Sequence, residues 1–289
     1  MLSFLSQKIK GKSGATVLFD IGGTKMRVAV SFDGVHIVGE KHLPTPPDFK
    51  TGIASFVRLA HQATNGAPIL RAVGGAAGVL TRDKDAFFHS PHLPQWNGKP
   101  LKKRLSQLLE APVHLENDSA VVGLGEAHVG AGHGYDIVAY ITVSTGVGGA
   151  RIVCGKIDEA SFGFEPGHQI INFEDQAHKS HGELENYVSG TSITERFNID
   201  PKDLSNKRAL SQLAKTLSFG IHNTIVHWSP DVVVFGGSVM TGRNVIPLDE
   251  VETHLKKSLY FLPKLPKLKK GALGSRGGLE GALVLAGQP

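Results

Sequence analysis

Residues 17–30 have the sequence VLFDIGGTKMRVAV, in which an apolar run leads into two glycines and then into a second apolar run. Apolar runs of this length bounded by glycine are typical of β-strands, and the short connection between them indicates a hairpin. The pattern returns at 137–153, where IVAYITV precedes the turn STGVGG and a return strand. Both turns contain a threonine and paired glycines. This repetition predicts two similar domains that face each other across a cleft.

The rest of the apolar periodicity predicts helices that alternate with strands. Helices are expected at 51–64, 101–109 and 208–227, and strands at 35–38, 113–115 and 231–235, with a loop of small residues at 74–78. Elements in this order indicate an α/β fold. We expect an N-terminal domain over 15–115 and a C-terminal domain over 116–277, with a last helix near 278–289 that packs back on the first domain.

The composition is that of a soluble globular protein. Of the 289 residues, 40% are hydrophobic and 20% are charged. No apolar run approaches the ~18 residues that a membrane helix needs. Cys154 is the only cysteine, which excludes an intramolecular disulfide and any zinc site that needs two thiolates. Residues 1–14 lack the features of a signal peptide, so we expect a cytoplasmic protein.

The formal charge of +5 comes from basic residues spread along the chain. The densest basic cluster is interleaved with prolines and leucines, which is typical of a solvated connection; it contains Lys264, Lys267, Lys269 and Lys270. A run this short is weak evidence for a nucleic-acid partner. We expect small-molecule partners, with neither nucleic acid nor a membrane among them.

Two common phosphate-binding motifs fail on inspection. The sequence GKS at 11–13 lacks the glycine that a P-loop requires at position 6, and Arg151 stands where a dinucleotide fingerprint starting at Gly146 needs glycine. The two glycine turns remain, and each also fits a tight hairpin without a ligand. Glycines let a backbone approach phosphate and direct several N–H groups at it, and a threonine hydroxyl adds a donor. Asp20, directly before the first turn, has the oxygen ligands that magnesium prefers.

The motif DIGGTK at 20–25 resembles the first phosphate motif of the superfamily that contains sugar kinases, heat-shock chaperones and actin. The ROK family (repressors, unknown reading frames and sugar kinases) is matched more closely. Its supporting motifs follow in the family's order: END at 116–118 with GE at 125–126, STGVGG at 144–149, EPGH at 165–168, LENYVSG at 184–190 and PDVVVFGG at 230–237. The resemblance implies two ribonuclease-H-like domains of the actin-like ATPase type.

The resemblance also implies roles for individual residues. Asp118 matches the carboxylate that takes the proton from the attacking sugar hydroxyl, and its alternative role is to cap a helix that begins at Ser119. Positions that contact the sugar match Asn117, Glu165, His168 and Glu185. Positions that bind phosphate or nucleotide match Asp20, Gly22, Gly23, Thr24, Lys25, Thr145, Gly146, Gly236 and Gly237. Asp20 would hold magnesium through water, so the implied cofactors are ATP and Mg²⁺.

The chain departs from the family near the sugar. Many ROK kinases place a zinc ion there, on a histidine that matches His168 and on three cysteines. The corresponding segment 173–185 reads FEDQAHKSHGELE and contains no cysteine. We therefore expect no zinc; the alternative is a substitute site in which His178, His181 and Glu183 join His168. Without zinc the orientation of His168 is open, because the metal normally orients it.

The acceptor sugar does not follow from these motifs. The loop at 74–78 lacks the prolines usual in the family, and His92 replaces a frequent asparagine before Leu93 and Pro94. We expect phosphorylation of the 6-hydroxyl of glucose or a related aldohexose. The alternatives are an N-acetylhexosamine kinase, a glucokinase that uses polyphosphate, and a sugar sensor without turnover. Residues 1–16 are too few for a helix-turn-helix, so we expect no DNA-binding regulator; a homodimer stays open.

Overall fold

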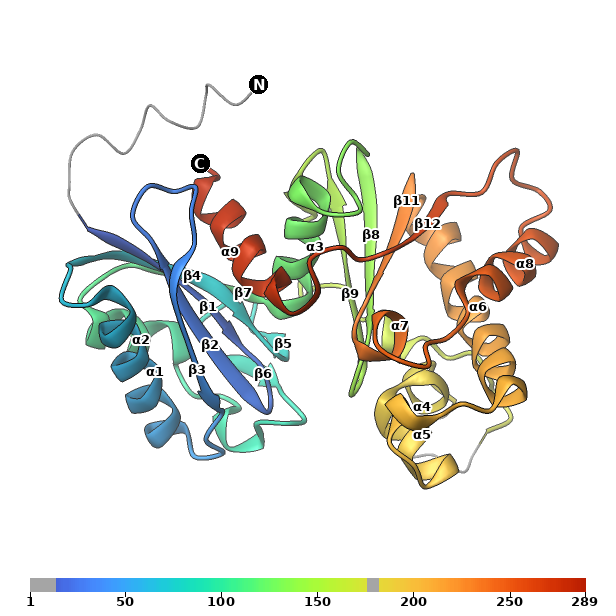
Figure 1. Ribbon diagram of the computed structural model, residues 1–289, viewed down its shortest axis with the longest axis horizontal. Coiled ribbons are helices and arrows are strands. Elements are labelled where there is room, and N and C mark those ends of the chain that lie inside the picture. The colour runs from blue at the N-terminus through green and yellow to red at the C-terminus, as the bar shows by residue number, and fades with distance from the viewer. Residues whose placement is uncertain (1–13, 176–181) are drawn as a thin grey trace. The chain divides into compact units, whose positions relative to one another are not determined.

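The computed structural model describes residues 14–175 and 182–289 (Figure 1). The chain divides into two compact units. The first contains the residues up to Gly125 together with Glu159–Gly163 and Ser275–Pro289, and the second contains Glu126–Asp158 and Phe164–Gly274. The chain therefore enters the second unit inside helix α3 (Asp118–Val129) and returns to the first after Gly274. This division groups residues 116–125, assigned above to the second domain, with the first unit.

The first unit is built on a five-stranded sheet in the order β3-β2-β1-β4-β7. Its strands are β1 (Ala15–Ile21), β2 (Lys25–Ser31), β3 (Val38–Pro44), β4 (Ile69–Ala76) and β7 (Val113–Asn117), and a small second sheet pairs β5 (Val79–Leu80) with β6 (Phe87–His89). The first two strands form the predicted antiparallel hairpin, whereas β1, β4 and β7 run parallel. The carboxyl ends of these three strands therefore meet at one edge of the sheet.

Helices cover both faces of this sheet. One face carries α1 (Phe49–Thr64) and α2 (Leu101–Leu109), and the other carries α9 (Gly277–Gly287) (Figure 1). The rings of Phe19 in β1 and Phe56 in α1 meet edge to face, with centroids 5.3 Å apart, and both side chains are fully buried. Because both faces are covered, the central strand β1 is a nearly continuous buried apolar run.

The second unit repeats this construction. Its sheet has the order β10-β9-β8-β11-β12, with β8 and β9 antiparallel and β8, β11 and β12 parallel. The strands are β8 (Ile137–Val143), β9 (Val147–Val153), β10 (Lys156–Ile157), β11 (Val232–Gly236) and β12 (Lys267–Lys270). The helices are α4 (Glu185–Val188), α5 (Gly190–Phe197), α6 (Lys207–Trp228), α7 (Ser238–Thr241) and α8 (Leu248–Ser258). The α/β class and the internal repeat are thus confirmed. Of the helices described, none combines the length and the apolar character needed to cross a membrane.

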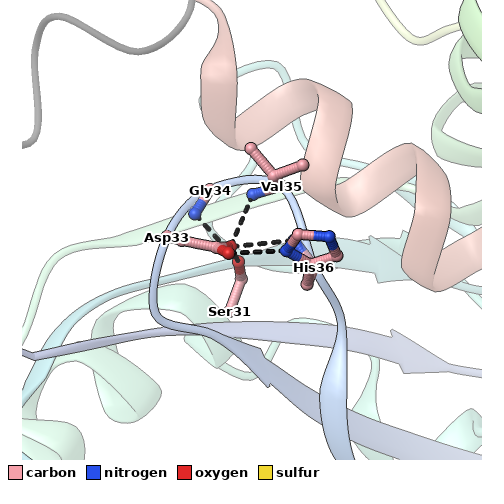
Figure 2. Close-up of polar contacts among 5 residues, drawn as sticks. All are labelled: Ser31, Asp33, Gly34, Val35 and His36. Atoms are coloured by element: carbon pink, nitrogen blue, oxygen red, sulfur yellow. Dashed lines mark hydrogen bonds and ion pairs between the residues drawn. The ribbon is translucent and has the colours of Figure 1, made fainter.

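The predicted strand at 35–38 is wrong, because β3 begins only at Val38. The carboxylate of Asp33 accepts the N–H groups of Val35 and His36, both at 2.8 Å, and also contacts the imidazole of His36 (Figure 2). The hydroxyl of Ser31 accepts the N–H of Gly34 at 3.0 Å. Local side-chain bonds of this kind hold the backbone in a turn, so its N–H groups do not join a ladder.

The predicted loop of small residues at 74–78 is also largely wrong, because β4 continues to Ala76. A Cβ on Gly74 would lie 2.0 Å from the carbonyl oxygen of Phe19 in the neighbouring strand. A Cβ on Gly75 would lie 2.8 Å from Cα of Asp118. The glycines therefore allow close packing of a strand against its neighbours, a role that composition alone does not distinguish from a loop.

Candidate active site

Hydrogen bonds within the turn between β1 and β2, and from Thr45 to it, fix its backbone. The N–H of Gly22 donates to the carbonyl of Lys25 at 2.9 Å, and the hydroxyl of Thr45 donates to the carbonyl of Gly22 at 2.7 Å. The N–H of Thr45 donates to the carbonyl of Thr24 at 2.9 Å. Within the described residues, nothing accepts a hydrogen bond from the N–H groups of Gly23 and Thr24. These two donors are therefore available to an anion.

Asp20 is the next-to-last residue of β1, one residue before this turn, and is half-buried. Its pKa is raised from 3.8 to about 6, first by burial and then by the negative charge of Asp118, against the opposing effect of Arg27. One guanidinium nitrogen of Arg27 lies 3.4 Å from the Asp20 carboxylate. The two carboxyl groups at the same sheet edge thus repel each other. A divalent cation would relieve this repulsion, so the donor set fits the expected magnesium.

Asn117 and Asp118 lie where β7 ends and α3 begins. Oδ1 of Asn117 accepts the N–H of Ala120 at 3.1 Å, and its amide nitrogen donates to the carbonyl of Gly78 at 3.1 Å. Asn117 therefore makes the capping bond that the alternative interpretation gave to Asp118. Oδ1 of Asp118 accepts the N–H of Ser119 at 2.8 Å, and within residues 14–175 and 182–289 its Oδ2 makes no hydrogen bond. Burial raises the pKa of Asp118, against the hydrogen bonds from Ser119.

His92 lies against the first glycine turn. A Cβ on Gly23 would stand 2.3 Å from Cβ of His92, so the histidine closes one side of the turn. The nearby imidazole also opposes the rise in the pKa of Asp118. The resemblance to the family indicates that His92 bears on which sugar is accepted, because it replaces a frequent asparagine. Its observed neighbours are the phosphate turn and the carboxylate that matches the base.

The second unit holds its own glycine turn between β8 and β9. The carbonyl of Gly146 accepts a hydrogen bond from the N–H of Ser144 at 2.8 Å, and the carbonyl of Thr145 accepts one from the hydroxyl of Thr191 at 2.9 Å. Oε2 of Glu185 accepts the N–H of Val147 at 2.6 Å. Glu185, expected to contact the sugar, therefore also braces this turn. The sequence analysis did not predict that bracing.

Gly236 and Gly237 lie at the end of β11, beside that turn. Because β8 and β11 are parallel, their carboxyl ends meet at one edge, and the hydroxyls of Ser144 and Ser238 are 3.4 Å apart. Gly237 has φ of +85°, and a Cβ there would lie 2.2 Å from the carbonyl oxygen of Val143. Glycine is needed at this position for both reasons. The structure thus brings together two of the predicted phosphate-binding turns.

Glu165 directly precedes a short 3₁₀ turn (Pro166–His168) in the second unit, and His168 is the last residue of that turn. Nδ1 of His168 lies 2.7 Å from Oε2 of Glu183. Burial lowers the pKa of His168, but the hydrogen bond to Glu183 and the charges of Glu183, Glu185 and Glu165 outweigh it, so the pKa is raised. Three acidic side chains, those of Glu165, Glu183 and Glu185, therefore form one acidic group around the imidazole.

This acidic group does not form a recognisable metal site. Across residues 14–175 and 182–289, no three histidine, cysteine, aspartate or glutamate side chains are arranged to hold a metal ion. His178 and His181, the other members of the substitute zinc site considered above, lie outside the described residues. Cys154 stands in the turn after β9. Sequence reasoning considered Glu183 only as a metal ligand and missed its bond to His168, which only the pairing of distant segments creates.

Comparisons with known proteins find relatives that match almost the whole chain. The chain is 28% identical to an N-acetyl-D-glucosamine kinase of Pectobacterium atrosepticum, over 92% of this chain and 97% of the relative. It is 26% identical to a glucokinase of Streptomyces coelicolor, over 96% and 98% of the two chains.

A solved structure resembles the fold over almost its whole length. It is that of a ROK family glucokinase from Streptomyces griseus in complex with glucose and AMPPNP, with a TM-score of 0.80 and 25% identity, covering 94% of this chain and 99% of that one. The ROK family model matches residues 16–288. This protein is therefore a member of the ROK family.

Proposed function

We propose that the protein is a sugar kinase that transfers the γ-phosphoryl group of ATP to a hexose hydroxyl. The observation that carries the proposal is the sheet edge of the first unit, where a half-buried carboxylate with a raised pKa, Asp118, lies at the same edge as Asp20 and the Gly22–Thr24 turn. A base, a cation ligand and an anion-binding turn at one edge are the parts that phosphoryl transfer needs. Relatives named as glucokinase and N-acetyl-D-glucosamine kinase support the same class.

Asp118 accepts the proton of the attacking hydroxyl as the new oxygen–phosphorus bond forms. The bond between the γ-phosphorus and its bridging oxygen breaks at the same time, and ADP leaves with that electron pair. A carboxyl group whose pKa burial has raised is a better proton acceptor than an exposed one, provided that it is ionised when the sugar binds. Asn117, fixed through its side chain at the start of α3, offers its second amide hydrogen to a sugar hydroxyl.

The N–H groups of Gly23 and Thr24 would hold oxygens of the transferred phosphoryl group. Asp20 would hold magnesium through water, and the ion, when bound with the nucleotide, neutralises charge on the phosphate oxygens. In the second unit, the Thr145–Gly146 and Gly236–Gly237 turns would bind the nucleotide. Glu165, His168 and Glu185 would contact sugar hydroxyls, since carboxylates and an imidazole offer directed hydrogen bonds to a polyol.

The experiment is an ADP-release assay with ATP and magnesium over a panel that contains glucose, mannose, N-acetylglucosamine and N-acetylmannosamine. We expect the highest kcat/KM with glucose, and a sugar-dependent signal that Asp118→Ala abolishes. A preference for N-acetylglucosamine would keep the kinase and replace the acceptor. Polyphosphate in place of ATP tests the alternative donor. Sugar binding by calorimetry without any ADP release would identify a sensor and refute the kinase.

A further inference from the structure

His168 and Glu183 form a pair that the transfer reaction itself does not require. Nδ1 of the imidazole and Oε2 of the carboxylate are 2.7 Å apart. The side chain of Glu183 is 22% exposed, whereas that of His168 is 53% exposed. The bonded carboxylate is thus the more buried partner, and the imidazole remains accessible to a ligand. Within the described residues, Nε2 of His168 makes no hydrogen bond.

Backbone pairing brings the segments of His168 and Glu183 together, so their contact does not depend on side-chain rotamers alone. Ile170 and Glu183 form an antiparallel bridge, and the N–H of Leu184 donates to the carbonyl of Gln169 at 2.8 Å. Gly182, directly before Glu183, has φ of +80°. The segment after the histidine is therefore paired with the segment that carries the glutamate, and the turn into this pairing requires glycine.

We propose that Glu183 is a positioning residue that orients His168 toward the sugar. The carboxylate accepts the Nδ1–H of the imidazole, which selects one tautomer and fixes the plane of the ring. Nε2 is then the nitrogen presented to a substrate hydroxyl. The inference rests on the proposed function, because it takes His168 as a sugar contact.

This assignment explains how His168 is oriented without the zinc ion that many ROK kinases place beside the sugar. The three cysteine ligands that hold zinc in many ROK kinases have no counterpart here, because the segment 173–185 contains no cysteine and Cys154 lies in a turn elsewhere in the unit. A hydrogen bond to a carboxylate fixes the tautomer and orientation of an imidazole in the same way that outer partners fix metal-bound histidines. In this chain, the glutamate takes the place of the ion.

The neighbouring acids Glu185 and Glu165 also have defined hydrogen bonds. Glu185 uses one carboxylate oxygen to accept the N–H of Val147, at 2.6 Å. Glu165 precedes the 3₁₀ turn, and the N–H of His168 donates to its carbonyl at 3.1 Å. The observed hydrogen bond of the imidazole Nδ1 goes to Glu183.

The first test measures sugar binding by calorimetry, which does not depend on turnover. We compare the wild type with Glu183→Ala, Glu183→Gln and the control Glu174→Gln, which changes an exposed glutamate in the same segment. Loss of a charged hydrogen bond should weaken binding of the best sugar of the panel roughly tenfold or more in the alanine variant. We expect an intermediate effect for glutamine, whose amide oxygen can still accept the Nδ1–H, and none for the control. Where turnover is measured, KM for the sugar should rise more than kcat falls.

The second test observes the imidazole directly, without a ligand. Long-range ¹H–¹⁵N spectra report the tautomer of each histidine, and His168→Gln assigns the signal. The wild type should show the Nδ1–H form, and Glu183→Ala should shift the signal toward a mixture with the Nε2–H form. The alanine exchange should also add little to the effect of His168→Gln on sugar binding, because both remove the same oriented group.

The outcomes separate this inference from the proposed function. Absence of sugar binding and of ADP release in the wild type refutes the function, while the spectra still decide whether Glu183 orients the ring. Unchanged sugar affinity or an unchanged tautomer in Glu183→Ala overturns the positioning role. Stoichiometric zinc in the purified protein, lost on the Glu183 exchanges, would also overturn it and make the glutamate a metal ligand.

Discussion

Glu126 should be a major determinant of the stability of the second unit. It lies where the chain enters that unit and is 2% exposed. Its Oε2 accepts the N–H groups of Ala131 at 2.8 Å and Ala272 at 3.1 Å, and its Oε1 accepts the N–H of Leu273 at 2.9 Å. Leu273 comes directly before Gly274, after which the chain returns to the first unit. One buried carboxylate therefore joins the two connecting segments.

The size of the effect follows from these hydrogen bonds. Glu126→Ala leaves three partly buried N–H groups without their acceptor, and a fully buried donor without a partner would cost about 1–3 kcal/mol. Water that enters the vacated space reduces the cost, so we expect a loss of about 3 kcal/mol in the free energy of unfolding. Glu126→Gln can keep an oxygen at one position but places an NH₂ group against the remaining N–H. We expect a loss of about 1–3 kcal/mol for it.

The assay combines urea denaturation with amide hydrogen exchange. The N–H groups of Ala272 and Leu273 should exchange about tenfold to a hundredfold faster in Glu126→Gln, since each 1.4 kcal/mol is a factor of about ten. The control is Glu252→Gln in α8, an exposed glutamate paired with Lys256 at 2.8 Å, which should cost below about 1 kcal/mol. The reasoning is refuted if both variants lose the same stability and the two amides exchange at the wild-type rate.

Three further predictions concern the first unit. Asp118→Asn keeps the size of the side chain but removes the base, so kcat in the ADP-release assay should fall about 10²–10⁴-fold with a small change in KM; a kcat within tenfold of the wild type would exclude the base. The pKa of Asp20 is about 6 in the folded state, against 3.8 for the same group in the unfolded chain. The stability that its neutral form contributes is therefore fully present below about pH 4, and this contribution, up to about 3 kcal/mol, is lost as the pH rises through 6. Asp20→Asn should therefore gain stability relative to the wild type between pH 4 and pH 7 in thermal melts, and a difference independent of pH would contradict this. Gly23→Ala places a Cβ 2.3 Å from that of His92, which should cost about 1–3 kcal/mol in urea denaturation. Combining it with His92→Gly should restore part of that stability, and equal stability of the single and double variants would speak against the contact.

The central strands and several helices were predictable because the sequence patterns that indicate them are local. The hairpin of β1 and β2, helix α2 (Leu101–Leu109) and strand β8 (Ile137–Val143) follow from apolar runs between glycines or from helical periodicity. The start of β3 was not predictable in this way. Val35 is apolar, but the carboxylate of Asp33 bonds its N–H and keeps it in a turn. A side chain two residues away thus overrides the apolar pattern.

The sequence proposes the residues of the candidate site but not their contacts. Asn117 and Asp118 lie at the start of α3, and the capping bond that the local sequence pattern assigned to Asp118 as its alternative role is made by Asn117. It proposed Glu185 for the sugar, and the structure adds its bond to Val147. The roles in catalysis stay predictions until the variants above are measured.

The sequence by itself determined the family, the α/β class and the repeated glycine turns, because each is written in short stretches such as 20–25 and 144–149. Only the tertiary structure decided that Glu183 holds His168 and that Glu126 joins Ala272 and Leu273. The physical reason is sequence distance. A local motif reports backbone conformation and residue chemistry, whereas a bond between residues 15 or 146 positions apart depends on strand pairing that folding alone establishes.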